Sequence, residues 1–265
     1  MNTIEILQQQ AKRLRKSPGR RDLTFAVYQK CVEEFGSFNN AKEKAELKLQ
    51  RRSPCKPLTE QQKEYTQTLA KIVSYLTFDG HLCKNLKGFF ISSNNIVDLL
   101  TFEEWIIEQF AIKAKKIEQN KYCLSNRNYK IWFFNTEVSR HLYEIGTPKG
   151  NKILTEFRIP EWIRENKEFA RAYIAIAYLC EGTNKEKRPN PSIKINQYKN
   201  KEIIKQGLEF MEDLKNILSQ FNIRTGKTSI CKGNLRKDGI ITKELKFKVS
   251  AKDNSKFYSE IGWLK

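Results

Sequence analysis

Two segments of the chain carry almost no charge, although charged residues make up 30% of the sequence. Residues 69–78 contain Lys71 as their single charge, and residues 170–180 contain only Arg171. A helix that is apolar around nearly its whole circumference is buried on most of its surface. The pattern therefore predicts two buried helices, around which the rest of the fold is built.

Each apolar segment ends in an acid followed by a glycine, at Asp79-Gly80 and at Glu181-Gly182. The stretches after the two pairs share a pattern of an extended segment, an amphipathic helix, two more strand-like segments and a last helix. In the first half we expect an extended segment at 88–93, a helix at 94–116, the strands KYCLSN and KIWFFN around 127–129, and a helix at 136–145. In the second half we expect an extended segment at 192–198, a helix at 202–221, strands at 227–233 and 244–250, and a helix at 254–261. The pattern predicts a twofold internal repeat joined through residues 147–163.

The first 57 residues form a separate basic segment with 13 Lys/Arg and 6 acids. Apolar residues recur at helical spacing from Phe25 to Phe35, and Gly36 ends the pattern. Ser37 is expected to cap a second helix over 38–49. Two readings stay open: a DNA-binding helix-turn-helix, and a solvated basic helical hairpin. Residues 51–57, with two prolines, are the expected linker.

Composition narrows the class of partner. The chain of 265 residues has a formal net charge of +19, which favours a polyanion. It contains no apolar run long enough to span a membrane and no apolar signal core at its start. Six scattered cysteines and two histidines argue against a zinc site and for reduced thiols. We therefore expect a cytoplasmic or organellar-matrix protein that is not secreted.

The two acids suggest a specific chemistry. An acid at the C-terminal end of a buried helix faces the negative pole of the helix dipole and is costly to desolvate unless it is paired or binds a metal. Two such acids at equivalent places suggest two helices packed side by side with their carboxylates together. On a basic surface this favours a Mg²⁺ site completed by phosphate oxygens. The alternative is that each acid caps a loop or pairs with a nearby lysine.

The segments AKIVSYLTFDGHL and RAYIAIAYLCEG resemble the two signature helices of the LAGLIDADG homing endonucleases, in the form with both repeats in one chain. The resemblance covers residues 69–265, including the joint PKGNK…IPEWI and the ending SAKDNSKFYSEIG. Residues 32–47 resemble short repeats appended to some homing endonucleases. The resemblance implies an α+β fold: two pseudo-symmetric αββαββα repeats forming a saddle of antiparallel sheets, plus a small N-terminal helical domain.

The resemblance also implies roles for individual residues. Asp79 and Glu181 match the family's metal-binding acids, and Gly80 and Gly182 match the glycines beside them, so all four are assigned to the metal site. The implied cofactor is Mg²⁺, for which Mn²⁺ or Ca²⁺ can substitute. A lysine from a late strand often stabilises transition-state charge in this family, and Lys248 is the candidate here. Asp79, Glu181 and Lys248 are the predicted catalytic set.

Alternation along the strands predicts a DNA-facing surface. In ELKFKVS the apolar residues point one way and Lys246 and Lys248 the other, and in SIKINQY Lys194 and Asn196 oppose two isoleucines. A solvated sheet face has the same pattern. Basic residues of the loops add phosphate contacts. The expected DNA-binding residues are Arg127, Asn128, Lys130, Lys185, Lys187, Arg188, Lys194, Asn196, Arg236, Lys237, Lys246 and Lys248.

Together these observations predict a monomeric, metal-dependent endonuclease that cuts both strands of a long double-stranded DNA site. The expected domains are 1–57, a helical DNA-binding module with its linker, and two repeats at 58–150 and 151–265. One alternative is a maturase acting on intron RNA, or a non-cleaving DNA-binding regulator, on the same fold. Another is a structural nucleic-acid protein whose charge is only an electrostatic footprint.

Overall fold

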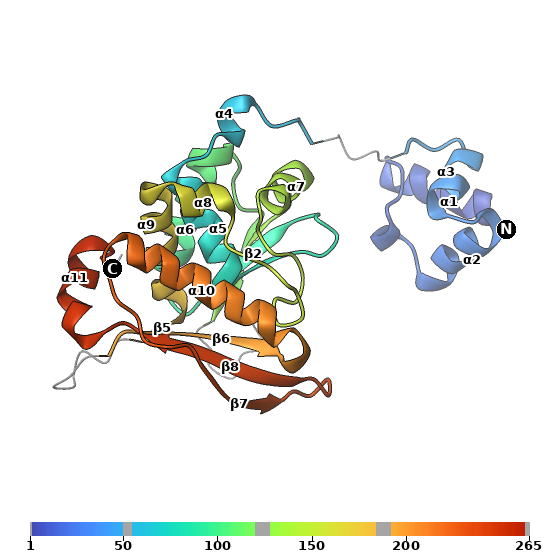
Figure 1. The fold of residues 1–265 in the computed structure, drawn as a ribbon. Helices are drawn as coiled ribbons and strands as arrows, with labels where there is room; N and C mark the ends of the chain where they lie inside the picture. The colour runs from blue at the N-terminus through green and yellow to red at the C-terminus, as the bar shows by residue number, and fades with distance from the viewer. Residues whose placement is uncertain (1, 50–54, 120–127, 184–191, 263–265) are drawn as a thin grey trace. The chain divides into compact units, whose positions relative to one another are not determined.

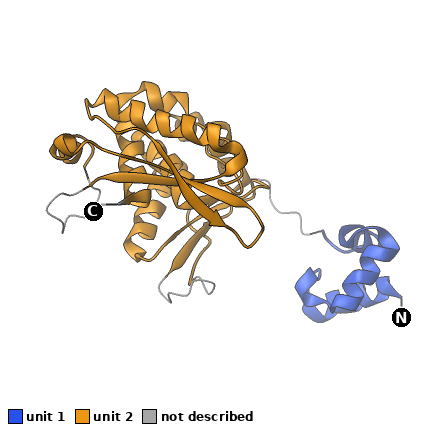
Figure 2. Cartoon of the chain, turned by 60° about the horizontal axis from the view of Figure 1, so that its bottom comes forward, with its two compact units in different colours: residues 1–54 blue, residues 55–265 orange. Residues whose placement is uncertain are grey.

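The computed structural model describes residues 2–49, 55–119, 128–183 and 192–262. The chain divides into two compact units, Met1–Pro54 and Cys55–Lys265 (Figure 2). The boundary lies three residues before the expected end of the linker at residue 57. Among the described residues, no helix is long and apolar enough to cross a membrane.

The first unit consists of three short helices around a small core. The core residues are Leu7, Cys31, Ala41 and Ala45. Gly36 ends the second helix with a φ of +74°, and the Ser37 side chain caps the third, as expected. That third helix ends at residue 44 and not at 49, because the chain turns back there to pack Leu47 against the core. The helices are α1 (Thr3–Leu14), α2 (Phe25–Phe35) and α3 (Phe38–Lys44).

The second unit contains two antiparallel sheets of four strands each and the helices that cover them (Figure 1). The sheets have corresponding strand orders, β1-β2-β4-β3 and β5-β6-β8-β7. This arrangement confirms the predicted α+β class. The strands are β1 (Gly80–Leu82), β2 (Phe89–Ser93), β3 (Lys116–Gln119), β4 (Tyr129–Phe133), β5 (Gly182–Thr183), β6 (Lys194–Asn200), β7 (Ser229–Leu235) and β8 (Ile241–Lys248). The helices are α4 (Glu60–Lys63), α5 (Gln67–Phe78), α6 (Ile96–Phe110), α7 (Thr136–Glu144), α8 (Glu161–Glu165), α9 (Lys167–Glu181), α10 (Ile204–Gln220) and α11 (Asn254–Glu260).

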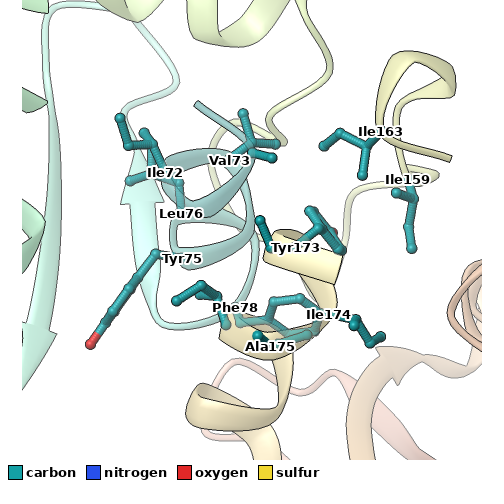
Figure 3. Packing of buried hydrophobic residues seen from close by; sticks show 14 of the residues in the cluster. Ile72, Val73, Tyr75, Leu76, Phe78, Ile159, Ile163, Tyr173, Ile174 and Ala175 are labelled. Carbon is teal, nitrogen blue, oxygen red and sulfur yellow. The ribbon is translucent and has the colours of Figure 1, made fainter. Parts of the chain in front are cut away.

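The two uncharged segments form the central helices α5 and α9, as the sequence predicts. They pack side by side, and nearly every residue of the last three turns of α5 is buried. In Figure 3 the buried side chains of both helices are seen together, with Tyr75 projecting away from α9. Tyr75 instead packs against Phe102 and Trp105 of α6. Helix α5 packs against α6, and α9 packs against α10, so that both halves share one continuous core.

Each sheet places one face on this core. In the first sheet Phe89, Ile91, Ile131 and Phe133 are fully buried beneath α5 and α6. In the second, alternating residues of β6 and β8 do the same beneath α9 and α10. The opposite faces carry the residues in between, which are half-buried or exposed.

The first half differs from expectation between residues 111 and 119. The predicted helix 94–116 ends at Phe110, because Ala111 adopts the left-handed conformation that closes the helix. The Glu103 carboxylate then accepts a hydrogen bond from the Ala114 backbone N–H at 2.8 Å, which holds the returning chain. As a result β3 begins at residue 116, earlier than the predicted strand KYCLSN, all of which lies outside the described residues.

Candidate active site at the ends of the two central helices

Asp79 and Glu181 lie at matching ends of the two central helices. Asp79 is the C-terminal cap of α5, and Glu181 is the last residue of α9. Taken as a whole residue, Asp79 is more exposed to solvent than Glu181, which is half-buried. Each acid is followed at once by a strand, β1 or β5, which is the first strand of its sheet. The acids therefore sit where the helix pair meets the two sheets.

The glycines after the acids permit this sharp change from helix to strand. A Cβ at Gly182 would stand 2.2 Å from the carbonyl oxygen of Tyr178, and one at Gly80 would stand 2.8 Å from the Cα of Leu76. Any side chain at either position would collide with the last turn of the preceding helix. The sequence assigned these glycines to the metal site, and that assignment stays a prediction.

Contacts across the helix pair hold the two acid-bearing ends together. The Ser74 hydroxyl of α5 donates a hydrogen bond to the Tyr173 backbone carbonyl of α9 at 2.7 Å. The Phe78 and Tyr173 rings pack edge to face, 6.0 Å between centroids. At the end of the pair the Cys180 thiol of α9 hydrogen-bonds with Asp79 of α5. This last contact ties one predicted acid to the residue that precedes the other.

The two carboxylates influence each other's charge. Burial raises the pKa of Glu181 to about 6, and repulsion from Asp79 acts in the same direction. Partial desolvation also raises the pKa of Asp79, while the Cys180 hydrogen bond opposes the rise. Electrostatic coupling of this kind requires that the two acids lie near each other. The expectation that the helices bring both carboxylates to one place is consistent with this coupling.

Lys152 is a residue of this site that the sequence did not indicate. It comes from the segment between the two halves, and its ammonium donates hydrogen bonds to the backbone carbonyls of Leu76 at 3.3 Å, Phe78, and Gly80 at 2.8 Å. These carbonyls lie at the end of α5, where helical partners run out and the dipole is negative. Burial lowers the pKa of Lys152 to about 8, and Asp79, Cys180 and Glu181 oppose that shift.

A second lysine holds the segment that carries Lys152. Lys199 of β6 is fully buried, and its ammonium donates hydrogen bonds to the backbone carbonyls of Lys152 at 2.8 Å and Thr155 at 3.0 Å. The same ammonium lies 3.6 Å from the centroid of the Phe157 ring. Burial lowers the pKa of Lys199 to about 7, and the charge of Lys152 adds to the shift. On the other side, Gly150 donates its backbone N–H to the Leu82 carbonyl of β1 at 2.8 Å.

The predicted lysine of a late strand lies on the outer face of the second sheet. Lys248 is exposed and is paired in register with Lys194, which is paired with Thr183 just after Glu181. Asn196 and Lys246 form the next row on the same face. Leu245 and Phe247 of β8, and Val249 after it, point into the core, so the predicted alternation of ELKFKVS is confirmed.

The remaining predicted DNA-binding residues are spread over both sheets. Lys130 is half-buried on the outer face of β4, and Asn128 precedes that strand. Arg236 and Lys237 lie in the turn between β7 and β8, where Arg236 contacts Asp238 at 3.2 Å. Four other residues fall outside the described residues, namely Arg127, Lys185, Lys187 and Arg188.

The donor set at the helix ends suits a hard divalent cation. Two carboxylates that repel each other supply the oxygen ligands that Mg²⁺ prefers, leaving further positions for water and phosphate. Across the described ranges no group of three or more His, Cys, Asp or Glu residues gathers as a metal site. A cation here would therefore depend on these two acids and on ligands from a bound substrate.

No protein-family model matches the chain. Among curated proteins it is 31% identical over 168 residues to the "tRNA-splicing ligase RtcB" of Pyrococcus abyssi, covering 60% of this chain and 18% of that protein. It is 26% identical over 166 residues to the "Replication factor C small subunit" of Methanocaldococcus jannaschii, covering 59% of this chain and 9% of that protein. The chain thus spans less than a fifth of the length of these relatives.

Among solved structures, variants of the homing endonuclease I-DmoI superpose with a TM-score of 0.47 at 15% identity, over 76% of this chain and 91% of theirs. Full-length DUF199/WhiA from Thermatoga maritima superposes with a TM-score of 0.48 at 15% identity, over 78% of this chain and 60% of that one. Likenesses at these identities and TM-scores carry no conclusion about function.

Proposed function

We propose that this protein is a metal-dependent endonuclease that cuts double-stranded DNA at the paired acids Asp79 and Glu181. The observation that carries the proposal is the convergence of these acids at the ends of two packed helices, each followed directly by the first strand of a sheet. In this arrangement a scissile phosphate would lie over the helix ends while the flanking duplex extends along the outer sheet faces.

The charge of the second sheet supports a polyanionic partner. Lys194 and Lys248 lie directly opposite each other on neighbouring antiparallel strands. Two basic side chains next to each other on an outer sheet face favour a polyanionic partner, whose phosphates could interact with both. Lys246 and Asn196 in the next row offer donors that can reach phosphates or base edges.

Asp79 and Glu181 would hold the divalent ion. Such an ion, when bound, supplies an activated water and stabilises the departing oxygen in phosphodiester hydrolysis. Lys152 has a different part, because its ammonium is engaged with the carbonyls at the end of α5. It is a positioning residue that fixes the Asp79-bearing helix end and lessens the repulsion between the two acids. Lys248 stays a candidate for contact with the transition state.

The matches to curated proteins support the proposal that this chain is encoded by a segment that moves between genes. The matched proteins are a tRNA-splicing ligase and a replication factor subunit, and each match occupies only a small part of the longer protein. A segment shared by proteins of unrelated activity is expected of an endonuclease that is carried within host genes by an intron or intein. The N-terminal unit, with its basic flanks and helix–glycine–helix order, is proposed as an added DNA-binding module.

The proposal is tested with a duplex selected for binding from a randomised pool. Wild-type protein should cut that duplex with Mg²⁺ and not with chelator. Asp79→Asn and Glu181→Gln should keep their affinity while cutting at least about 100-fold more slowly. Glu104→Gln, which neutralises an exposed acid of α6, is the matched control and should cut normally.

Two results would contradict this function. One is full cutting activity in the variant that combines Asp79→Asn with Glu181→Gln, and the other is cutting that persists without any divalent ion. Binding without cutting by the wild type would favour the regulator reading. Preference for intron RNA over the duplex would favour the maturase reading. Binding that does not weaken with salt would argue against phosphate contacts altogether.

A further inference from the structure

The outer face of the first sheet carries a row of aromatic rings. His81 of β1, Phe90 of β2 and Trp132 of β4 are paired in register across three neighbouring strands. The His81 and Phe90 ring centroids lie 5.1 Å apart, and those of Phe90 and Trp132 lie 4.3 Å apart. Phe134, which is 54% exposed, continues the row by stacking on Trp132 at 5.6 Å. We call these four residues the aromatic row.

The second sheet has lysines at the corresponding places. The two sheets can be matched through Gly80 and Gly182, which follow the acids and pair with Ile91 and Ile195. The residues just before these isoleucines also correspond, so Phe90 of β2 takes the place of Lys194 of β6. By the same register, Trp132 corresponds to Lys248. Beyond this row the sheets agree again, because Lys130 corresponds to Lys246.

The aromatic row presents an apolar surface. His81 stacks on Phe90 and Phe134 stacks on Trp132, while the Phe90 and Trp132 rings meet at a tilt of 42°. The indole N–H of Trp132 is already used in a hydrogen bond of 2.7 Å to the Glu118 carboxylate. None of these four side chains belongs to the buried core on the other side of the sheet. The row is thus a partly exposed strip of rings that begins at His81, two residues after Asp79.

Charge around the strip fits duplex DNA. The Lys130 ammonium lies 4.8 Å from the Phe90 ring centroid. The Lys116 ammonium lies 5.7 Å from that of Trp132 and forms an ion pair with Glu118 at 2.6 Å. Lys130 therefore places a cation beside the strip, which suits a partner with a phosphate next to an apolar group. In the major groove of DNA the one apolar group on a base edge is the C5-methyl of thymine, which contacts aromatic and aliphatic side chains.

We propose that the aromatic row reads thymine methyl groups in one half of the DNA target, while the lysine pair of the second sheet reads the other half through polar contacts. This inference rests on the proposed DNA-binding function and names what distinguishes its two halves. It predicts that the target is chemically unequal on the two sides of the cut.

The test removes the methyl groups without altering the protein. The preferred duplex is selected with the full wild-type chain in chelator and resynthesised with uracil for thymine in one half or in the other. Affinity should fall about fourfold for each contacted methyl group in one half and stay unchanged in the other half, which is the matched control. The variant Phe90→Lys/Trp132→Lys, which copies Lys194 and Lys248, should lose this penalty.

A second variant separates the two kinds of readout. Lys194→Gln/Lys248→Gln should bind more weakly and with a smaller salt dependence, yet keep the penalty for uracil. Thermal unfolding of each variant checks that the fold is retained. Equal penalties in both halves, or none while the duplex is still bound, would overturn the inference and leave the endonuclease standing. Failure of the wild type to bind any duplex would overturn both.

Discussion

Lys199 provides a quantitative test of how the site is supported. In the folded protein burial lowers the pKa of Lys199 to about 7, whereas lysine in the unfolded chain has its ordinary pKa of 10.5. Unfolding therefore takes up a proton near neutral pH, and that uptake becomes less favourable as pH rises. The sign is fixed by this difference: the free energy of unfolding must increase with pH across the interval between the two values.

The size of the effect follows from the same two pKa values. At pH 7 the folded protein is about half protonated at Lys199, and at pH 9 it is almost fully neutral, while the unfolded chain stays protonated throughout. The free energy of unfolding should rise by about 2 kcal/mol from pH 7 to pH 9 through this residue alone. Lys199→Met has similar length and no charge, so it should lack this rise.

Urea unfolding followed by tryptophan fluorescence is the suitable assay. All four tryptophans lie beyond residue 55, so the signal reports on the second unit only. The quantity to compare is the difference between wild type and Lys199→Met at pH 7, 8 and 9, in which titrating groups that do not interact with Lys199 cancel. Lys201→Met, which removes an exposed neighbouring lysine, is the control. A difference that changes by less than about 0.5 kcal/mol would refute the assignment.

Three further perturbations probe the same architecture. Lys152→Met leaves three carbonyls around the end of α5 without their donor and should lower the free energy of unfolding by about 2–5 kcal/mol. Urea unfolding measures this loss, and an unchanged midpoint would speak against the role given to this lysine. Gly182→Ala should cost about 2 kcal/mol or more in the same assay, because its Cβ meets the Tyr178 carbonyl, whereas Gly226→Ala has room and should be nearly neutral. Asp253, whose pKa the Arg224 guanidinium holds at about 2, should contribute stability that is lost as pH falls from about 4 to 2. Asp253→Asn should flatten that part of the acid profile, and an unchanged profile would count against the ion pair.

The central elements could be predicted because their signal is local. Helices α5 and α9 stand out as uncharged segments in a chain that is 30% charged, and the acid–glycine pairs mark their ends. Residues 25–35 and the glycine after them likewise predict α2 and its end closely. Periodicity and helix-ending residues are properties of neighbouring positions, so the sequence displays them directly.

The supporting residues could not be predicted because their roles arise from tertiary contacts. Lys152 and Lys199 are two among 49 basic residues, and nothing in their neighbourhood distinguishes them from solvated lysines. The burial of Lys199 depends on the joint passing over β6, and Gly207 makes room for it. The aromatic row requires the register of three strands, one of which follows residues outside the described part of the chain. Only this register shows that Trp132 occupies the place that Lys248 has in the second sheet.

The joint between the halves makes the centre of the molecule unequal by construction. A pair of identical chains facing each other across a twofold axis would place either two such lysines or none beside the two acids. One continuous chain contributes a single Lys152, which donates its hydrogen bonds to the α5 side. The covalent connection thereby places the Lys152 ammonium at the end of α5, and the chain has no second copy of this connection to do the same at the end of α9. The two carboxylates, similar in sequence position, therefore lie in different electrostatic surroundings.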